Sequence, residues 1–196
     1  MVAILYLLSL SSSRMKSVFR QSGLFKIASM NDPWKALRRH SKGWMEDPAA
    51  KVHVSIMFGA GFMVTPAFVA KHNITHVINC AQDSDSPQWF RDHNPSKYKC
   101  INAIDSKDVN ITEWYSLFAN TMNRFLADPE SIVVFVHCQC GINRSGFLTL
   151  LYCIQKFGYD FESTVKMILA QRPCALTNPV FRQQLINFIK SNGRSG

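Results

Sequence analysis

A cysteine and an arginine six residues apart form the most reactive pattern in this chain. Cys138 follows the β-branched and aromatic run of residues 133–136, and Arg144-Ser145 opens an apolar run long enough for a helix. The first N–H groups of a helix lack partners and its dipole is positive there, so such an end binds anions and stabilises a thiolate. A guanidinium can bind a phosphate bidentately. The spacing therefore predicts an ionised Cys138 that attacks a phosphate bound by Arg144.

The order His-Cys-x5-Arg-Ser, with a glycine three residues after the cysteine, resembles the signature of the cysteine-dependent protein phosphatases. Residues 52–192 resemble the small dual-specificity phosphatases, including the poxvirus type, in the order and spacing of their elements. The resemblance implies hydrolysis of phosphotyrosine and of phosphoserine or phosphothreonine in proteins through a Cys138 thiophosphate intermediate, with no metal and no cofactor. The alternative is a loop with a buried cysteine and a surface arginine and no catalytic role. The motif becomes an active site only if the predicted strand, loop and helix are present around it.

Hydrolysis of a phosphate monoester needs a nucleophile, donors for the three equatorial oxygens and a proton for the leaving oxygen. We expect loop N–H groups and the Arg144 guanidinium to bind the phosphate, with Gly141 permitting the turn. Ser145 is expected to donate a hydrogen bond to the Cys138 sulfur, and His137 to orient the loop from behind. The predicted phosphate-binding residues are Gln139, Cys140, Gly141, Ile142, Asn143 and Arg144.

The proton donor is expected in residues 104–111, which follow a predicted strand and should reach the same edge of the sheet. This segment is similar to the acid loop of the family, in which an Asp follows the strand and an Asn-apolar pair starts the next helix. Asp105 matches that position, and Asp108 is the second candidate. Asp105 is expected to protonate the leaving oxygen and then, as a carboxylate, to activate water. Either carboxylate could instead cap the helix that begins at Thr112.

Asn143 leaves the substrate class open. An asparagine at this position resembles both the poxvirus-type phosphatases and the RNA 5′-triphosphatases of the same superfamily, whose loops carry Asn-Arg-Thr/Ser-Gly. The presence of Asp105 favours protein substrates over RNA, because the RNA enzymes work without that acid. A phosphate-binding pseudophosphatase is less favoured, because such proteins typically lose the cysteine, the arginine or the acid, and all three are present.

The elements that must position these residues alternate between strands and helices. Strands are predicted over 52–58, 75–80, 98–103 and 132–136, and helices over 66–72, 112–126, 145–157, 161–171 and 179–190, with a polar loop over 81–95. This alternation predicts an α/β fold, a three-layer sandwich with a central, mainly parallel sheet flanked by helices. Active sites in such sheets lie at the carboxyl ends of strands, where Cys138 falls.

The formal net charge of +9 is concentrated at the start of the chain. Residues 1–45 hold eight of the 22 lysines and arginines and one acidic residue, whereas the rest hold fourteen basic and twelve acidic residues. A near-neutral catalytic region disfavours a nucleic-acid-binding domain. The predicted organisation is a flexible basic extension over 1–31, an amphipathic helix over 32–46, a catalytic domain over 47–192 and a flexible tail over 193–196.

The predicted helix begins at Asp32-Pro33, an Asp cap followed by Pro at the first position. Its apolar face consists of Trp34, Leu37, Trp44 and Met45. Packing on its own domain is favoured, and the alternative is a homodimer, because the poxvirus-type enzymes that the chain resembles dimerise through an N-terminal helix. The apolar run of residues 2–10 is too short to span a bilayer, and weak contact with a membrane surface is a further alternative.

The six cysteines are not expected to form structural disulfides. Cys100 and Cys153 lie in apolar runs, and Cys138 must stay a thiol to react. Cys138 and Cys140 lack a second Cys/His pair at the spacing of a zinc site. We therefore predict a reducing compartment, the cytoplasm or nucleus, or the virion if the protein is viral. Cys80 could trap an oxidised Cys138 as a disulfide, core packing being the favoured alternative.

Overall fold

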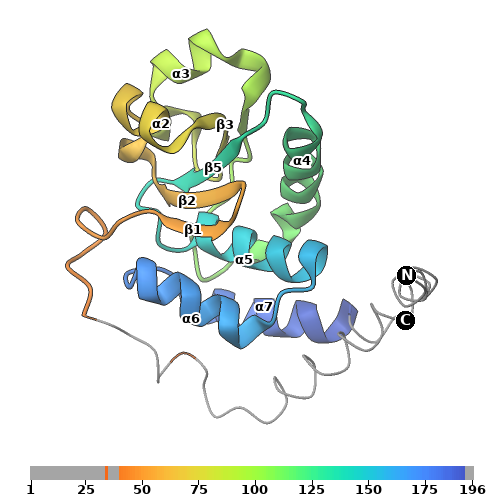
Figure 1. The fold of residues 1–196 in the computed structure, drawn as a ribbon. Coiled ribbons are helices and arrows are strands. Elements are labelled where there is room, and N and C mark those ends of the chain that lie inside the picture. Colours follow the sequence, from red (N-terminus) through yellow and green to blue (C-terminus); the bar gives the residue numbers. More distant parts are fainter. Residues whose placement is uncertain (1–33, 35–39, 193–196) are drawn as a thin grey trace, which may run out of the picture.

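The computed structural model describes residue 34 and residues 40–192 and shows a five-stranded sheet between two layers of helices (Figure 1). The strands are β1 (Ala50–His53), β2 (Ile56–Ala60), β3 (Ile74–Asn79), β4 (Tyr98–Cys100) and β5 (Val133–Cys138). Their order is β1-β2-β5-β3-β4, with β1 antiparallel to β2 and every other neighbouring pair parallel. The predicted α/β fold with a mainly parallel sheet is confirmed.

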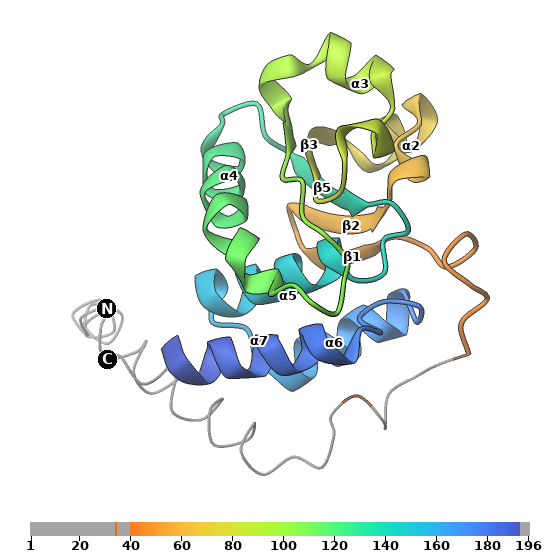
Figure 2. The same ribbon diagram turned by 180° about the vertical axis from the view of Figure 1, so that it is seen from behind.

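Four longer helices cover one face of the sheet, and two short ones cover the other (Figures 1 and 2). The first group is α4 (Tyr115–Ala127), α5 (Arg144–Phe157), α6 (Phe161–Gln171) and α7 (Pro179–Asn192). The second is α2 (Pro66–His72) and α3 (Gln88–His93). Single 3-10 turns are η1 (Gly61–Met63), η2 (Asp83–Asp85), η3 (Pro95–Lys97) and η4 (Ile111–Trp114).

The central strand β5 divides its side chains between two cores. Val134, Val136 and Cys138 belong to the core under α4 to α7. Val133 and Phe135 belong to the smaller core under α2 and α3. Because both faces of a parallel strand are covered, every residue of β5 is buried, as its continuous apolar sequence predicts.

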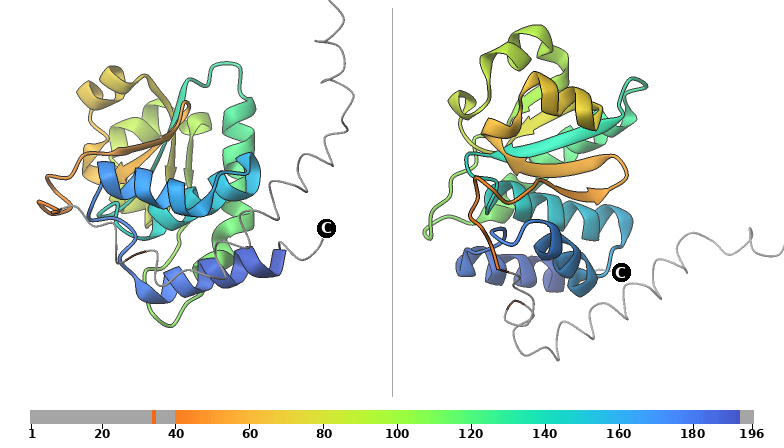
Figure 3. Two further views of the ribbon diagram at one scale, coloured as in Figure 1. Left: turned by 60° about the horizontal axis from the view of Figure 1, so that its bottom comes forward. Right: turned by 60° about the vertical axis from the view of Figure 1, so that its left-hand side comes forward.

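Helix α5 lies between the sheet and helices α6 and α7 (Figure 3). Nine consecutive residues, Ser145 to Cys153, are buried, as expected for a helix that is covered on all sides. The helix ends at Gly158, which adopts the left-handed conformation with φ 68° and donates its N–H to Ile154 O. Because Ser145 and Gly146 are among the buried residues, the first turn of α5 also lies inside the domain.

Two strand predictions and one loop prediction need correction. The strand predicted over residues 52–58 is a hairpin of β1 and β2, joined at Val54-Ser55, and the Ser55 N–H donates to His53 Nδ1 at 3.2 Å. This turn contains neither glycine nor proline, so the apolar run conceals it. The strand predicted over 98–103 ends at Cys100 as β4, and the loop predicted over 81–95 contains η2 and α3.

The helix predicted over residues 32–46 does not extend over 40–46, which form irregular structure and a turn. Gly43 has a φ of 104°, and its carbonyl accepts the N–H groups of Glu46 and Asp47 at 3.1 and 2.9 Å. The Asp47 carboxylate accepts hydrogen bonds from Ser41 Oγ and Lys42 N, and such local bonds compete with a helix.

The predictions for the two ends of the chain lie largely outside the described residues. These are the extension over 1–31, the first part of the helix at 32–33 and 35–39, and the C-terminal tail over 193–196. Trp34 is described and packs edge-on against Phe161 of α6, with ring centroids 5.5 Å apart. Its side chain is 4% exposed, so it packs on its own domain. None of the described helices is long and apolar enough to cross a membrane.

Candidate active site

Cys138 lies at the carboxyl end of β5, beneath the first turn of α5. Cys138 is 2% exposed, and Ser145 beside it is fully buried. The Ser145 hydroxyl donates to the Cys138 sulfur, with 3.3 Å between Oγ and Sγ. The strand, loop and helix thus place a hydroxyl donor against the candidate nucleophile, as the sequence predicts.

The 139–144 loop turns its carbonyl groups outward. Gln139 O accepts from Gly61 N, Ile142 O from Leu176 N and Asn143 O from Phe147 N. The carbonyls of Cys140 and Gly141 both accept from the Arg172 side chain. Each trans peptide unit points its N–H opposite to its carbonyl, so the N–H groups of residues 140–144 face the inner side of the loop. Such a ring of inward N–H groups is an anion site.

Gly141 is required by both its conformation and its surroundings. Its φ is +62°, a region that costs other residues free energy. A Cβ at this position would lie 2.2 Å from the carbonyl carbon of Gly59 in β2. The loop therefore packs directly on the backbone of the neighbouring strand, which holds its shape.

His137 is fully buried behind the loop. Its Nε2 shares a hydrogen bond with Ser86 Oγ at 3.1 Å, and its carbonyl accepts the Cys80 N–H at 2.6 Å. Burial lowers the pKa of His137 from 6.5 to about 4, so the ring is neutral at pH 7. A neutral, buried ring suits the predicted orienting role of this residue.

Arg144 and Asp105 meet at the mouth of the loop. The Arg144 Nη1 donates to Ala103 O at 3.2 Å. This hydrogen bond holds the guanidinium beside the segment that carries Asp105. The Arg144 Nε lies 3.8 Å from Asp105 Oδ2. Asn143 Nδ2 and Asn178 Nδ2 approach the two carboxylate oxygens at 3.4 and 3.5 Å. The tertiary structure brings the first acid candidate to the loop.

Asp108, the second candidate, lies within its own turn. Its Oδ2 accepts a hydrogen bond from Ser106 Oγ at 3.3 Å, and its N–H donates back to the same hydroxyl. Neither carboxylate caps the next helix, because Asn110 Oδ1 accepts the Thr112 N–H at 3.1 Å and takes that role. The capping alternative for Asp105 and Asp108 is therefore wrong.

Asn143 joins the loop to the segment before α7. Its Oδ1 accepts from the N–H and the hydroxyl of Thr177 and from the N–H of Asn178, at 3.0 to 3.2 Å. Its amide nitrogen faces Asp105. One side chain therefore ties three segments together, a role that its position next to Arg144 does not indicate.

Arg172 is the main site-supporting residue that the sequence does not indicate. It is fully buried and all five of its guanidinium N–H bonds have carbonyl acceptors at 2.5 to 3.0 Å. The acceptors are Cys140 and Gly141 in the loop and Trp44, Asp47 and Pro48 in the N-terminal segment, residues 40–49. Asp47 Oδ2 also accepts the Cys174 N–H at 2.9 Å. The sequence around Arg172 shows only an arginine that follows a predicted helix and precedes Pro173, and this pattern does not indicate a role in the site.

The cysteines are all free thiols. Burial raises the pKa of Cys80 well above its usual range, and the nearby Cys138 adds to that shift. Burial also raises the pKa of Cys140. Within the part of the chain that the structure describes, no group of three or more His, Cys, Asp or Glu side chains could hold a metal ion.

The chain is similar to known proteins over most of the described residues. The family model described as dual specificity phosphatase, catalytic domain, matches residues 56–191. Human dual specificity protein phosphatase 22 is 30% identical over 122 residues, which cover 62% of this chain and 62% of that protein. Dual specificity protein phosphatase 1B of Arabidopsis thaliana is 27% identical over 124 residues, covering 63% and 71%. The chain therefore spans 62 to 71% of the length of these two relatives.

Solved structures share the fold. The crystal structure of DUSP15 has a TM-score of 0.61 and 26% identity, covering 74% of this chain and 90% of that one. The crystal structure of human DUSP28 has a TM-score of 0.62 and 18% identity, covering 74% and 95%. At this low identity the second likeness shows the arrangement of the backbone alone.

Proposed function

Because the chain belongs to the dual specificity phosphatase family, we propose that it hydrolyses phosphate monoesters on tyrosine, serine and threonine of proteins. The convergence of four side chains supports this activity. Cys138 lies against Ser145 at the floor of the 139–144 loop, and Arg144 and Asp105 lie at its mouth. These four groups are a nucleophile, a hydroxyl that donates to it, an anion binder and a carboxyl group, which suit the hydrolysis of a phosphate ester.

In the first step, the Cys138 thiolate attacks phosphorus, and the bond between phosphorus and the substrate oxygen breaks. Protonated Asp105 gives its proton to that oxygen, so the leaving group departs as a neutral alcohol or phenol. Arg144 and the inward N–H groups of the loop bind the equatorial oxygens while charge develops on them. The product of this step is a thiophosphate on Cys138.

In the second step, water replaces the sulfur. Asp105, now a carboxylate, takes a proton from the water as its oxygen bonds to phosphorus. The bond between phosphorus and sulfur breaks, and the Ser145 hydroxyl stabilises the thiolate that leaves through its 3.3 Å hydrogen bond. Asp105 ends the cycle protonated and Cys138 ends it as a thiolate. A thiol nucleophile also favours a reducing compartment, the cytoplasm or the nucleus.

The second candidate is the RNA 5′-triphosphatase activity of the same superfamily, kept because of the Asn-Arg-Ser-Gly order at residues 143–146. The carboxylate of Asp105 beside Arg144 favours the protein reaction, which needs an acid for a leaving group of high pKa. The near-neutral charge of residues 46–196 also disfavours a polyanionic substrate.

A two-part experiment tests this proposal. We expect the purified chain to hydrolyse p-nitrophenyl phosphate, Cys138→Ser to abolish the activity, and Cys100→Ser to retain it as a matched control. The same preparation is then given phosphotyrosine and phosphothreonine peptides and an RNA with a 5′-triphosphate. Efficient release of the RNA γ-phosphate with slow peptide turnover, unaffected by Asp105→Asn, would favour the RNA activity and overturn the proposal.

A further inference from the structure

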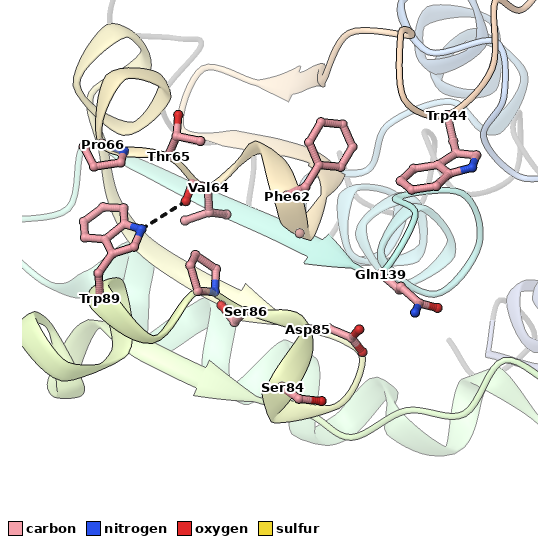
Figure 4. Close-up of a pocket in the computed structure, with 12 residues that line it drawn as sticks. Trp44, Phe62, Val64, Thr65, Pro66, Ser84, Asp85, Ser86, Trp89 and Gln139 are labelled. Carbon is pink, nitrogen blue, oxygen red and sulfur yellow. Dashed lines mark hydrogen bonds between the residues drawn. The ribbon is translucent and has the colours of Figure 1, made fainter.

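A pocket of about 470 Å³ opens directly beside the 139–144 loop, on the side of α2 and α3 (Figure 4). Gln139, the residue after Cys138, forms part of its wall. The other walls come from Trp44, from η1 and the start of α2, and from the segment from η2 to α3. A substrate whose phosphate occupied the loop would therefore pass a neighbouring residue over this pocket, because adjacent residues lie about 3.5 Å apart along an extended chain.

Aromatic rings form much of the pocket surface. Trp44 and Phe62 meet edge to face with ring centroids 5.7 Å apart, and Phe62 is 51% exposed. Trp89 is fixed at the far end because its Nε1 donates to Val64 O at 3.3 Å. Trp44, Phe62 and Trp89 therefore line one pocket, and ligand pockets are typically lined by such aromatic side chains.

The N-terminal segment fixes the Trp44 wall. The Trp44 carbonyl accepts from Arg172 Nη2 at 3.0 Å, and Arg172 also holds the 139–144 loop. The same guanidinium therefore sets the position of the loop and of one pocket wall. This shared support ties the backbone of Trp44 directly to the 139–144 loop.

The pocket carries one charged side chain among its described lining residues, the carboxylate of Asp85. Asp85 Oδ2 accepts the Gln82 N–H at 3.2 Å, which holds the carboxylate in place at the edge of η2. The nearby Asp83 is already paired with Arg91. The pocket therefore combines aromatic walls with a single fixed negative charge, which Figure 4 shows opposite Gln139.

We propose that this pocket binds an arginine side chain of the phosphoprotein substrate, close in sequence to the phosphorylated residue. A guanidinium stacks on aromatic faces and pairs with a carboxylate, and its methylene stem suits the apolar lining. An acidic or phosphorylated neighbour is repelled by Asp85, and an aliphatic one leaves that carboxylate covered without a partner. This inference rests on the proposed phosphatase activity and adds the substrate sequence that the enzyme prefers.

The test compares phosphotyrosine peptides that differ in one side chain. Arginine is placed in turn at each of the three positions before and after the phosphotyrosine and compared with citrulline, its neutral isostere, at the same position. At one position we expect kcat/KM to be about fivefold higher for arginine, the effect of a partly exposed ion pair with a cation–π contact. At the other positions the two peptides should react equally.

Two matched variants locate the effect. Asp85→Asn removes the charge but keeps an oxygen for the Gln82 N–H, and it is expected to make the arginine and citrulline peptides react equally. Asp92→Asn removes an exposed carboxylate of α3 that does not line the pocket, and it should keep the preference. Because each result is a ratio of two substrates on one preparation, it does not depend on the fraction of folded enzyme.

The outcomes separate the inference from the proposed function. If wild-type protein hydrolyses p-nitrophenyl phosphate but shows no arginine preference at any position, the inference is wrong and the phosphatase activity stands. A preference that survives Asp85→Asn, or a preference for norleucine over arginine, also overturns it. Failure of the wild-type protein to hydrolyse any of these phosphate esters overturns the proposed function and the inference together.

Discussion

At the residue scale, Asp105 is held loosely and remains partly open to solvent. Its contacts with Asn143, Asn178 and Arg144 are 3.4 to 3.8 Å long, and its side chain is 30% exposed. A group that donates a proton and then accepts one from water needs access to both the leaving oxygen and solvent. Its position fits both tasks.

We predict that Asp105→Asn lowers kcat about 100-fold for phenyl phosphate, the loss typical of a missing general acid. The loss should be smaller for p-nitrophenyl phosphate, because nitrophenolate leaves without much protonation. Asp108→Asn serves as the matched control and is expected to retain activity on both esters. Steady-state rates on the two substrates measure the effect, and equal losses for both esters would contradict an acid role.

His137 makes stability depend on pH. Its pKa is lowered by burial from 6.5 to about 4 in the folded protein, so between these values the unfolded chain takes up a proton that the folded protein does not. The contribution of His137 to the free energy of unfolding is therefore fully present above pH 6.5 and is lost as the pH falls towards 4. The slope is about 1.4 kcal/mol per pH unit for one group.

We therefore predict that the free energy of unfolding decreases from pH 6.5 to 4.5, and that His137→Gln flattens this slope. The exposed His93 provides the control, because His93→Gln should leave the slope as in the wild type. Urea unfolding at a series of pH values gives both the free energy and its slope. An unchanged slope in His137→Gln would show that other groups cause the pH dependence.

At the element scale, the unit that matters is β5, the 139–144 loop and α5. The strand is buried on both faces and the helix on all sides, so the loop between them has fixed ends. Its carbonyls accept hydrogen bonds from η1, from α5 and from the segment after α6. The loop is therefore preorganised, and a ligand would not need to order it.

Two glycines with similar conformations test this packing. Gly141 and Gly158 have φ values of 62° and 68°, but only Gly141 has backbone atoms close to the position of an added Cβ. We predict that Gly158→Ala costs about 1 kcal/mol, the cost of the left-handed conformation. Gly141→Ala should cost about 2 kcal/mol more, because β2 and the loop must move apart. Equal losses in urea unfolding would mean that the close approach is unimportant.

At the scale of the whole molecule, Arg172 joins the two ends of the catalytic region. It connects the loop to the N-terminal segment, up to 128 residues away in sequence. Asp47 reinforces this link through the Cys174 N–H. The N-terminal segment is thus part of the folded domain, as is the buried Trp34.

We predict that Arg172→Met lowers the free energy of unfolding by at least about 3 kcal/mol, because it leaves five carbonyls without their donor. Arg124→Met, at an exposed position of α4 beside Phe125, should cost about 1 kcal/mol at most. Urea unfolding of both variants at pH 7 provides the measurement. Similar losses in the two variants would exclude a structural role for Arg172.

The sequence alone predicts the parts of the site that depend on short spacings. Cys138, the loop, Arg144 and Ser145 lie within one strand–loop–helix unit, whose backbone geometry follows from local apolar patterns. The Asp105 prediction depends on two local features, a carboxylate that follows a predicted strand and the resemblance of residues 104–111 to the acid loop of the family. The sequence does not indicate the hairpin of β1 and β2, because its turn at Val54-Ser55 contains neither glycine nor proline.

Only the tertiary structure decided which distant residues support the site. Arg172, Asp47 and Asn178 reach the loop region from segments that carry no motif, and Asp85, Phe62 and Trp44 meet in one pocket from three separate segments. These contacts depend on how the layers pack on each other. Backbone preferences and periodicity act over a few residues, whereas the burial of a side chain and its partners are set by the whole fold.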